Sequence, residues 1–507
     1  MSLQERKKIF ILGATSSYVA DIFSIIVGLI SVPIGLHYFG PIRYGIWAVI
    51  SSVIAYLNLS NLGIPTAAQV LTSKALKPFE QRVVLLRSLF LLFISSIAVI
   101  ILIIGITHFY SNWVFVLGKI PVYFRNEAAE TGLAVAILFL LNLPLTIFSA
   151  GFIGLQKIYW AKFYNSIGMI AGLAALIFTV LLKRNLVTLA LFRGIAVLSI
   201  SIVCGLHFLF TNPDLRQKTD KPIDKEFSIK SIFVSSIRFF VIGIAAVVAC
   251  NTDNLVISHF LGSKVVTPYA ITFKIFTVGF SIFIAVNSTL LPMFSKASAL
   301  NQWEWIQQMY DRSTNIFPII GGLIWISGIA FAKEIINLWA GPSGYGGTIV
   351  VFAFGGVSYM LSMVNIHSNL LIGLNITKNM IYISWAEAIA NLGISIILIG
   401  YLGIGGVALG TFLATLLTVF WMLPLDIYKQ TEGKVKFNFR PIFSHALFIL
   451  IPCLCASIFV QRYWQNEINK IFMNLGIIGI YLILSWNILS SELRNLIKRT
   501  ITGVYNH

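Results

Sequence analysis

Long, continuous apolar runs recur along the whole chain, and they constrain its fold more than any other feature. A helix needs about 20 apolar residues to cross the hydrocarbon core of a bilayer, and about fourteen runs are long enough. They lie at about 12–36, 44–66, 84–108, 130–152, 158–182, 186–210, 232–258, 267–293, 313–337, 348–373, 378–401, 404–424, 442–460 and 471–490. A β-barrel would need alternating polar and apolar residues, which these runs lack. The sequence therefore predicts an all-α polytopic membrane protein.

The composition agrees with a chain that lies mostly in lipid. Of the 507 residues, 58% are hydrophobic and 11% are charged, and the mean hydropathy is +0.88, whereas soluble domains are about 45–50% apolar and about 25% charged. The formal net charge is +18. Because most of the cations lie in short loops between the runs, they indicate an anionic membrane surface as the partner, and no nucleic acid.

The distribution of lysine and arginine predicts the orientation of the chain. Of the 36 such residues, 24 fall in the N-terminal segment and the loops that share its side, nine fall on the other side, and three lie within spans. Cytoplasmic segments carry the excess of Lys and Arg, so both termini are expected in the cytosol. An even number of spans follows, which favours fourteen over thirteen.

A weak internal repeat predicts two matched halves. His37-Tyr38-Phe39-Gly40 recurs as His259-Phe260-Leu261-Gly262, and Ser73-Lys74-Ala75 recurs as Ser295-Lys296-Ala297, both at an offset of 222 residues. Parallel repeats of this kind commonly enclose a central cavity. We therefore expect two pseudo-symmetric six-helix lobes followed by two further helices. The expected segments are an N-terminal lobe at 1–211, a cytosolic linker at 212–231, a C-terminal lobe at 232–425, and the added helices with a cytosolic tail at 426–507.

Ionisable residues inside two neighbouring runs are the strongest functional signal. A charge at the centre of a membrane helix costs on the order of 2.5–3.5 kcal/mol. Asp253 and Lys274 each lie about seven residues from the shared turn, or about 10 Å deep at 1.5 Å per residue, which predicts an ion pair between them. Arg238 lies within about 60° of Asp253 around the same helix, and Asn251 and Asn254 flank Asp253.

Three more charges fall within other spans. Asp21 and Glu387 lie near mid-depth, and Arg193 lies in the outer part of its span. Arginine and lysine suit a phosphate or pyrophosphate, so Arg238, Lys274 and Arg193 are the candidate substrate-binding residues. A buried carboxylate suits coupling to H⁺ or Na⁺, which makes Asp253, Asp21 and Glu387, with Asn251 and Asn254, the candidate coupling or cavity residues. The alternative is that these groups only lock helices together.

Other patterns argue against catalysis and mark breaks in the helices. The chain has no nucleophile elbow, no His-Glu-x-x-His motif, no phosphate-binding Gly-rich loop and no ATP-binding module. Its four cysteines lie in apolar runs without metal-site spacing and are expected to be core residues; they are Cys204, Cys250, Cys453 and Cys455. The stretch Asn61-Leu62-Gly63-Ile64-Pro65 should break or kink the second span.

Two sets of motifs stand out at corresponding places in the two halves. The first set is Tyr38-Phe39-Gly40-Pro41-Ile42-Arg43-Tyr44-Gly45-Ile46-Trp47 with Leu59-Ser60-Asn61-Leu62-Gly63. The second is Asn251-Thr252-Asp253-Asn254-Leu255 with Phe260-Leu261-Gly262 and Tyr269-Ala270. They resemble the bacterial polysaccharide transporter family, whose members flip undecaprenyl-linked O-antigen and related units, and the resemblance covers about the first 300 residues. It places the chain near the wider superfamily that also holds the lipid II flippase and the multidrug and toxin extrusion antiporters.

The resemblance implies a two-lobed bundle that works by alternating access in the bacterial inner membrane. The substrate would be an undecaprenyl-pyrophosphate-linked oligosaccharide, whose headgroup enters the cavity while its tail stays among the membrane lipids. A polysaccharide polymerase and chain-length proteins are the expected partners. The alternatives are a lipid II flippase, a cation-coupled multidrug exporter, and a membrane-embedded transferase or polymerase, which the lack of a large outer loop disfavours.

Overall fold

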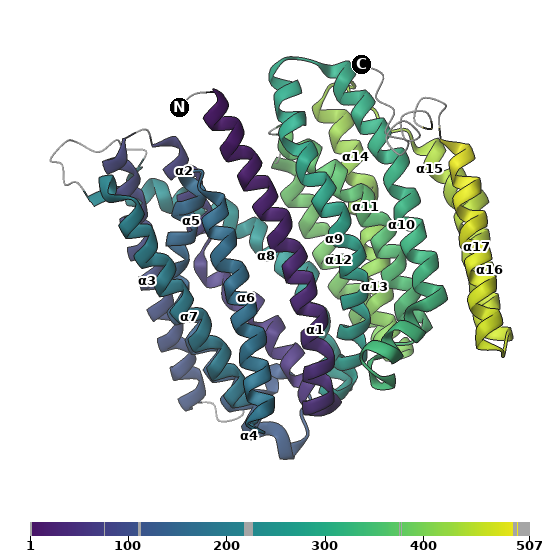
Figure 1. The fold of residues 1–507 in the computed structure, drawn as a ribbon, viewed down its shortest axis with the longest axis horizontal. Helices are drawn as coiled ribbons and strands as arrows, with labels where there is room; N and C mark the ends of the chain where they lie inside the picture. Colours follow the sequence, from purple (N-terminus) through teal and green to yellow (C-terminus); the bar gives the residue numbers. More distant parts are fainter. Residues whose placement is uncertain are drawn as a thin grey trace. The chain divides into compact units, whose positions relative to one another are not determined.

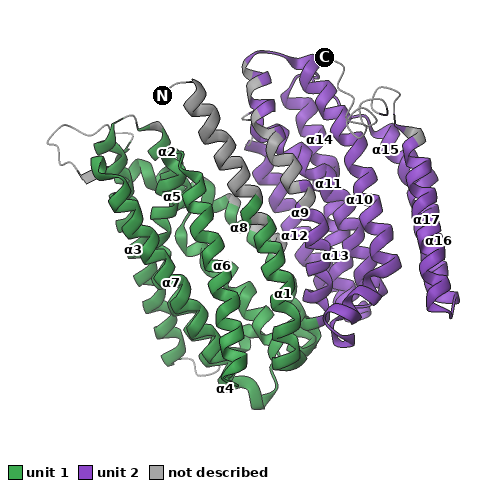
Figure 2. Ribbon diagram, in the orientation of Figure 1, with its two compact units in different colours: residues 1–267 green, residues 268–507 purple. Residues whose placement is uncertain are grey.

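The computed structural model contains helices and connecting segments, and no strand occurs among the residues that it describes, which are 3–75, 77–109, 113–216, 227–374, 376, 378–489 and 494. The chain divides into two compact units, Met1–Thr267 and Pro268–His507 (Figure 2). The lobe boundaries expected from the sequence stay predictions.

The helices follow one another with short connections (Figure 1). In unit 1 they are α1 (Leu3–Leu57), the 3₁₀ turn η1 (Asn58–Asn61), α2 (Ile64–Lys74), α3 (Pro78–Phe109), α4 (Arg125–Asn142), η4 (Leu143–Leu145), α5 (Thr146–Gly154), α6 (Ile158–Leu181), α7 (Leu186–Thr211), η5 (Pro213–Arg216) and α8 (Ile229–Leu261). The next helix, α9 (Ser263–Ala299), begins in unit 1 and continues into unit 2. Unit 2 continues with α10 (Trp303–Trp339), α11 (Thr348–Gly373), α12 (Lys378–Leu402), α13 (Ile404–Leu417), α14 (Val419–Gln430), α15 (Phe439–His445), η8 (Ala446–Leu450), α16 (Ile451–Tyr463) and α17 (Glu467–Ile488).

Two glycines form matching corners at the two copies of the repeat. Gly40 interrupts α1 with φ 72° and ψ 172°, and Gly262 ends α8 with φ 95° and ψ 160°. This part of φ/ψ space is accessible essentially only to glycine. The repeat His-x-x-Gly therefore ends a helical segment in the same backbone conformation both times, and the duplication stays a prediction.

The break expected near Pro65 is confirmed. The helix α1 ends at Leu57, η1 follows, and Leu62 and Gly63 both have positive φ angles of 51° and 72° before α2 begins. Pro65 sits in the first turn of α2, where its missing N–H has no helical partner to lose. A side chain at position 63 would also overlap the backbone of Ser236 in α8, so this glycine permits close contact as well as the turn.

Each unit has an apolar core of its own. In unit 1 the buried cluster draws residues from α2, α3, α4, α5 and α7, including Ile64, Leu92, Leu140 and Phe152. In unit 2 the cluster joins α9, α10, α11, α12 and α14. Gly355 of α11 allows Trp325 of α10 to lie against the helix backbone, because a Cβ there would overlap the indole ring. The C-terminal helices α16 and α17 pack on α10 and on each other.

The class predicted from hydropathy is confirmed. Eleven stretches of the described residues are long and apolar enough to cross a membrane, and Ile22–Asn61 counts as one of them although its helix breaks at Gly40. The most apolar stretch of α3 has a mean hydropathy of 3.1, and only 11% of it is buried inside the protein. This is the pattern of a helix that faces lipid. The number fourteen stays a prediction. Cys204 and Cys453 are buried as expected, whereas Cys455 is exposed, so that expectation was wrong for it.

Candidate functional site

The polar stretch of α8 packs against α1 within unit 1. The hydroxyl oxygens of Tyr56 and Thr252 lie 2.6 Å apart, and the Asn254 amide donates to the Ser52 hydroxyl at 2.9 Å. Ser52 and Tyr56 are four residues apart and so share one face of α1. These bonds hold the two helices together, which is the helix-locking role for this part of the polar face.

Asn251 and Asp253 flank these contacts and are partly buried on α8. The Asn254 carbonyl oxygen Oδ1 is buried and has no hydrogen-bond partner among the described residues. A buried acceptor without a partner is costly and is a common mark of a site that binds something absent. Asn254 therefore joins α8 to α1 through its NH₂ group and is also a candidate for ligand contact through its Oδ1.

Arg193 of α7 is the cation that the structure places most favourably for binding an anion. Its side chain is exposed, its guanidinium carbon lies 5.7 Å from the centre of the Trp47 ring on α1, and its stem passes over Gly172 of α6. No carboxylate or hydrogen-bond acceptor contacts it within the described part of unit 1. The ring face holds a cation in place without using its N–H donors, so no described residue of unit 1 occupies the donors that a ligand would need.

A salt bridge that the sequence did not indicate fixes the end of α7. Arg43 Nε donates to both carboxylate oxygens of Glu127, at 3.0 and 2.9 Å, and the backbone N–H of Leu186 donates to Glu127 Oε1 at 3.1 Å. Glu127 thus ties α1, α4 and the first residue of α7 together. The only signal in the sequence was an acidic residue in the first turn of α4, where the helix dipole favours it.

Replacing Glu127 by alanine should destabilise unit 1. The change leaves Arg43 and the Leu186 N–H without their acceptor, and the loss of such bonds costs about 1–3 kcal/mol in the free energy of unfolding. Thermal unfolding of the purified protein in detergent measures the effect. Glu467, which pairs with Lys470 at 2.8 Å on an exposed surface, provides the control, because Glu467→Gln should cause no measurable change. Equal stability of the Glu127 variant and wild type would contradict the tying role.

In unit 2, Glu387 belongs to a polar seam between α12 and α13. The Thr415 hydroxyl donates to Glu387 Oε1 at 3.0 Å. The Ser395 and Thr411 hydroxyls donate to Asn391 Oδ1 at 3.0 and 3.3 Å. Glu387, Asn391 and Ser395 follow one another at four-residue spacing, so they line one face of α12.

Small residues make this seam possible. Gly406 and Gly410 of α13 would each place a Cβ in the backbone or hydroxyl atoms of α12, at Leu398 and Ser395. Close backbone approach of this kind is typical of helix pairs in membranes. Sequence reasoning found Glu387 but missed Asn391, Thr411 and Thr415, although polar residues at four-residue spacing in apolar runs could have indicated them.

Fewer contacts are described for the other predicted residues, Lys274, Asp21 and Arg238. Lys274 of α9 is partly buried between the buried residues Ile271 and Phe276, and it has no acceptor within the described part of unit 2. Because Asp253 belongs to the other unit, the predicted Asp253–Lys274 pair stays a prediction. Asp21 lies in α1 and Arg238 in α8, and the side chains of both lie outside the described residues.

Unit 2 also contains a buried polar pair that the sequence did not indicate. The Tyr310 hydroxyl lies 2.9 Å from His367 Nδ1, and both residues are fully buried. His367 Nε2 has no partner among the described residues. Tyr310 and His367 belong to α10 and α11, so the hydrogen bond joins two helices whose remaining contacts in the core cluster are apolar.

Comparison with known proteins places this geometry in context. No family model matches the chain. It is 27% identical over 212 residues to a Salmonella typhimurium protein named "Putative O-antigen transporter", which covers 40% of this chain and about half (49%) of that relative. It is 23% identical over 444 residues to a Salmonella typhi protein of the same name, covering 83% of this chain and 96% of the relative.

Solved transporters share the fold. The lipid II flippase MurJ in its inward closed conformation matches with a TM-score of 0.72 at 16% identity, over 93% of this chain and 98% of that one. An inward-facing multidrug resistance MATE family transporter of the MOP superfamily matches with a TM-score of 0.65 at 15% identity, over 83% and 99%. The resemblance seen in the motifs is thus confirmed by similar proteins named as O-antigen transporters. The chain is a multi-pass membrane protein with the fold of MOP superfamily transporters.

Proposed function

We propose that the chain is a flippase that moves undecaprenyl-pyrophosphate-linked oligosaccharide units across the bacterial inner membrane. The units would belong to O-antigen or a related surface polysaccharide, and movement would follow alternating access. The observation that carries the proposal is Arg193, a cation within an apolar helix, which lies against Trp47 and Gly172 and has no acceptor among the residues of unit 1 that the structure describes. Intramembrane charges of this kind usually face a substrate path, and a guanidinium suits a pyrophosphate.

The other cations and the polar residues take supporting roles in this proposal. Lys274 and Arg238 would contact the pyrophosphate or acidic sugars, while Asp253, Asp21, Asn251 and Asn254 would line the path. A polysaccharide polymerase and chain-length proteins would receive the product. No step requires bond cleavage, so we propose that the protein is not an enzyme.

The test is a reconstituted flipping assay. Proteoliposomes containing the purified chain and a fluorescent undecaprenyl-pyrophosphate oligosaccharide should show time-dependent access of the sugar to an external lectin or reductant. Cells that lack the gene should lose surface polysaccharide and keep their sensitivity to cationic drugs. The MATE-like fold makes drug export the competing function. Raised drug accumulation together with unchanged polysaccharide in these cells would favour export and refute the flippase.

Glu387 is the residue that we propose couples transport to H⁺ or Na⁺. Its carboxylate accepts from the Thr415 hydroxyl of α13, and Asn391 and Ser395 follow it along the same face of α12. Carboxylate, hydroxyl and amide oxygens are the ligands that hard cations prefer, and a carboxylate also carries a proton. Glu387→Gln should abolish the response of flipping to an imposed H⁺ or Na⁺ gradient, because an amide neither takes up a proton as a carboxylate does nor offers a cation a negative charge. Flipping down the substrate's own gradient should persist.

The matched control is Glu432→Gln, since Glu432 is exposed in the segment after α14. This variant should keep both kinds of transport. A Glu387→Gln protein that responds to ion gradients like wild type would remove Glu387 from the coupling role and leave the flippase proposal intact.

A further inference from the structure

A small cavity lies within unit 2 between α10 and α15. Its volume is about 200 Å³. The helix α10 contributes Thr314, Asn315 and Pro318 to its lining, and α15 contributes Pro441, Ile442 and His445. We call it the α10–α15 cavity. Pockets that enclose whole small molecules measure about 300–1,000 Å³, so this cavity suits one end of a longer molecule.

The α15 side of the cavity carries a buried imidazole with one nitrogen unused. His445 is 3% exposed, and its Nε2 lies 3.1 Å from the Ser485 hydroxyl oxygen of α17. Its Nδ1 is buried and has no hydrogen-bond partner among the described residues. A buried polar atom without a partner destabilises the fold, so a ligand that bonds Nδ1 gains affinity at this position.

The α10 side of the cavity is polar as well. Asn315 is partly buried, and its side chain makes no hydrogen bond to another residue that the structure describes. Its amide offers both a donor and an acceptor. Pro318 lies inside the helix and has no N–H, so the carbonyl oxygen of Thr314, four residues earlier, lacks its usual helical donor.

The α10–α15 cavity favours an uncharged ligand. No lysine, arginine, aspartate or glutamate is among the lining residues that the structure describes. A phosphate, carboxylate or ammonium group would therefore leave water without a partner of opposite charge, which is costly. A hydroxyl group both donates and accepts, so it matches the amide and the imidazole without that cost.

The cavity lies at a level of the bilayer where the polar groups of lipids are found. Pro441 and Ile442 lie in the first turn of the candidate span Phe439–Tyr463, and the interfacial regions of a bilayer begin where its hydrocarbon ends. Phe443 and Leu447, on the same segment, are 52% and 58% exposed. Acyl chains beside this segment can therefore stay in hydrocarbon while a polar end enters the cavity.

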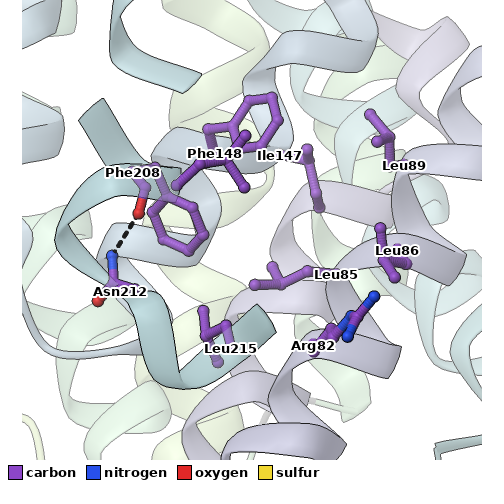
Figure 3. Close-up of a pocket in the computed structure, with 10 residues that line it drawn as sticks. Arg82, Leu85, Leu86, Leu89, Ile147, Phe148, Phe208, Asn212 and Leu215 are labelled. Atoms are coloured by element: carbon purple, nitrogen blue, oxygen red, sulfur yellow. Dashed lines mark hydrogen bonds between the residues drawn. The ribbon is translucent and has the colours of Figure 1, made fainter. Parts of the chain in front are cut away.

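A cavity of similar size in unit 1 lacks these features. It lies between α3, α5 and α7 and has a volume of about 190 Å³ (Figure 3). Its Asn212 donates to the Phe208 carbonyl oxygen at 2.8 Å and accepts from Lys157 at 2.7 Å, and its Arg82 has a partner as well. That cavity therefore offers a ligand mainly apolar contact, whereas the α10–α15 cavity also offers hydrogen-bonding groups.

We propose that the α10–α15 cavity binds the hydroxyl end of a neutral glycerolipid of the diacylglycerol type. Such a lipid carries one hydroxyl group beside ester carbonyl oxygens, so it can bond Asn315 and His445 at once. If Nδ1 carries the proton, it donates to an ester carbonyl and the hydroxyl bonds Asn315. If Nδ1 is bare, it accepts from the hydroxyl and the Asn315 amide donates to the ester. A simple long-chain alcohol would leave one of the two residues unpaired.

Native mass spectrometry of the full chain in detergent tests the site with two probes. They are 1,2-dioleoylglycerol and 1,2-dioleoyl-3-acetylglycerol, which differ only in whether the hydroxyl is capped. Wild type should retain the free alcohol about fivefold better, the contribution expected of one hydrogen bond between neutral groups. Asn315→Leu should remove most of that preference, while Asn337→Leu, the same change at an exposed position of α10, should leave it unchanged.

A second pair of variants tests the volume of the cavity. Ile319 also lines it, so Ile319→Phe should fill the space and lower the retention of both lipids. Ile335→Phe makes the same change on α10 where the side chain is 49% exposed, and it should retain both lipids like wild type.

Three results would overturn the proposal. They are equal retention of the two probes by wild type, an unchanged preference in Asn315→Leu, and displacement of dioleoylglycerol by an equal concentration of undecaprenol, which has a hydroxyl but no ester. A further arm uses only wild-type protein. Dioleoylglycerol with a photoreactive group near its hydroxyl should label peptides that contain residues 314–319 or 441–445. Labelling confined to other peptides, such as 85–89 or 208–215 of the unit 1 cavity, would refute the site even if a variant failed to fold.

Discussion

Replacing Arg193 by glutamate should abolish surface polysaccharide at normal protein abundance. The guanidinium is held over Trp47 and has no carboxylate partner in the described part of unit 1, so its removal leaves no buried acid unpaired and should not unfold the protein. Glutamate would instead repel a pyrophosphate. Loss of one hydrogen bond to a charged group costs about 1.5–3 kcal/mol, so a decrease in flipping of at least about tenfold is expected. Proteoliposome flipping and surface polysaccharide staining measure it.

Two further substitutions separate substrate contact from general damage. Arg193→Lys should keep part of the activity, because lysine retains the charge but loses the planar fork of donors. Arg184→Glu makes the same charge reversal in the exposed turn between α6 and α7 and should flip substrate like wild type. If Arg193→Glu kept wild-type flipping, the observation that carries the flippase proposal would be lost.

Replacing Gly410 by leucine should cause a large loss of stability in unit 2, because the leucine side chain cannot fit between α12 and α13. A Cβ at position 410 would overlap the hydroxyl of Ser395 and lie 2.8 Å from its backbone N and Cα. Backbone atoms cannot rotate away, so α12 and α13 must separate. Overpacking of this kind costs about 1–3 kcal/mol, and the bond that Asn391 of α12 receives from Thr411 of α13 would be lost in addition.

Thermal unfolding in detergent should show a clear decrease in the midpoint for Gly410→Leu, with less monodisperse protein. Gly393→Leu provides a matched control on α12, because nothing lies within 4 Å of a Cβ there. That variant should be as stable as wild type or slightly more so, since leucine favours a helix over glycine by up to about 1 kcal/mol. Equal stability of the two leucine variants would show that the α12–α13 contact is loose enough to absorb a side chain.

The membrane class and the chain breaks were predictable because they depend on local chemistry. A bilayer accepts only long apolar helices here, so hydropathy alone predicted the class. Gly63 and Pro65 predicted a break because their backbone preferences act within a few residues. The corner at Gly40 lies between the expected spans 12–36 and 44–66, because the backbone preference of glycine also acts locally.

The partners of the polar residues were not predictable from one sequence. Asn254 bonds Ser52 and Thr252 bonds Tyr56, across about 200 residues of chain, and no local pattern encodes such a pairing. Glu387 was identified because a charge in an apolar run is conspicuous. Asn391 and Thr411 are neutral, so their four-residue spacing to Ser395 and Thr415 is a weaker signal, and no local pattern shows that α12 and α13 bring them together.

Glycine is required at position 40 by the backbone dihedral angles and not by a lack of space for a side chain. A Cβ there would meet nothing within 4 Å, so no neighbouring atom excludes it. The strain comes from φ 72° and ψ 172°, whose mirror image is an ordinary extended conformation. A D-amino acid introduced at this position by chemical or cell-free synthesis would therefore fit where its L-enantiomer is strained. Substitutions at Gly40 would thus be selected against by backbone chirality, whatever molecule the protein carries.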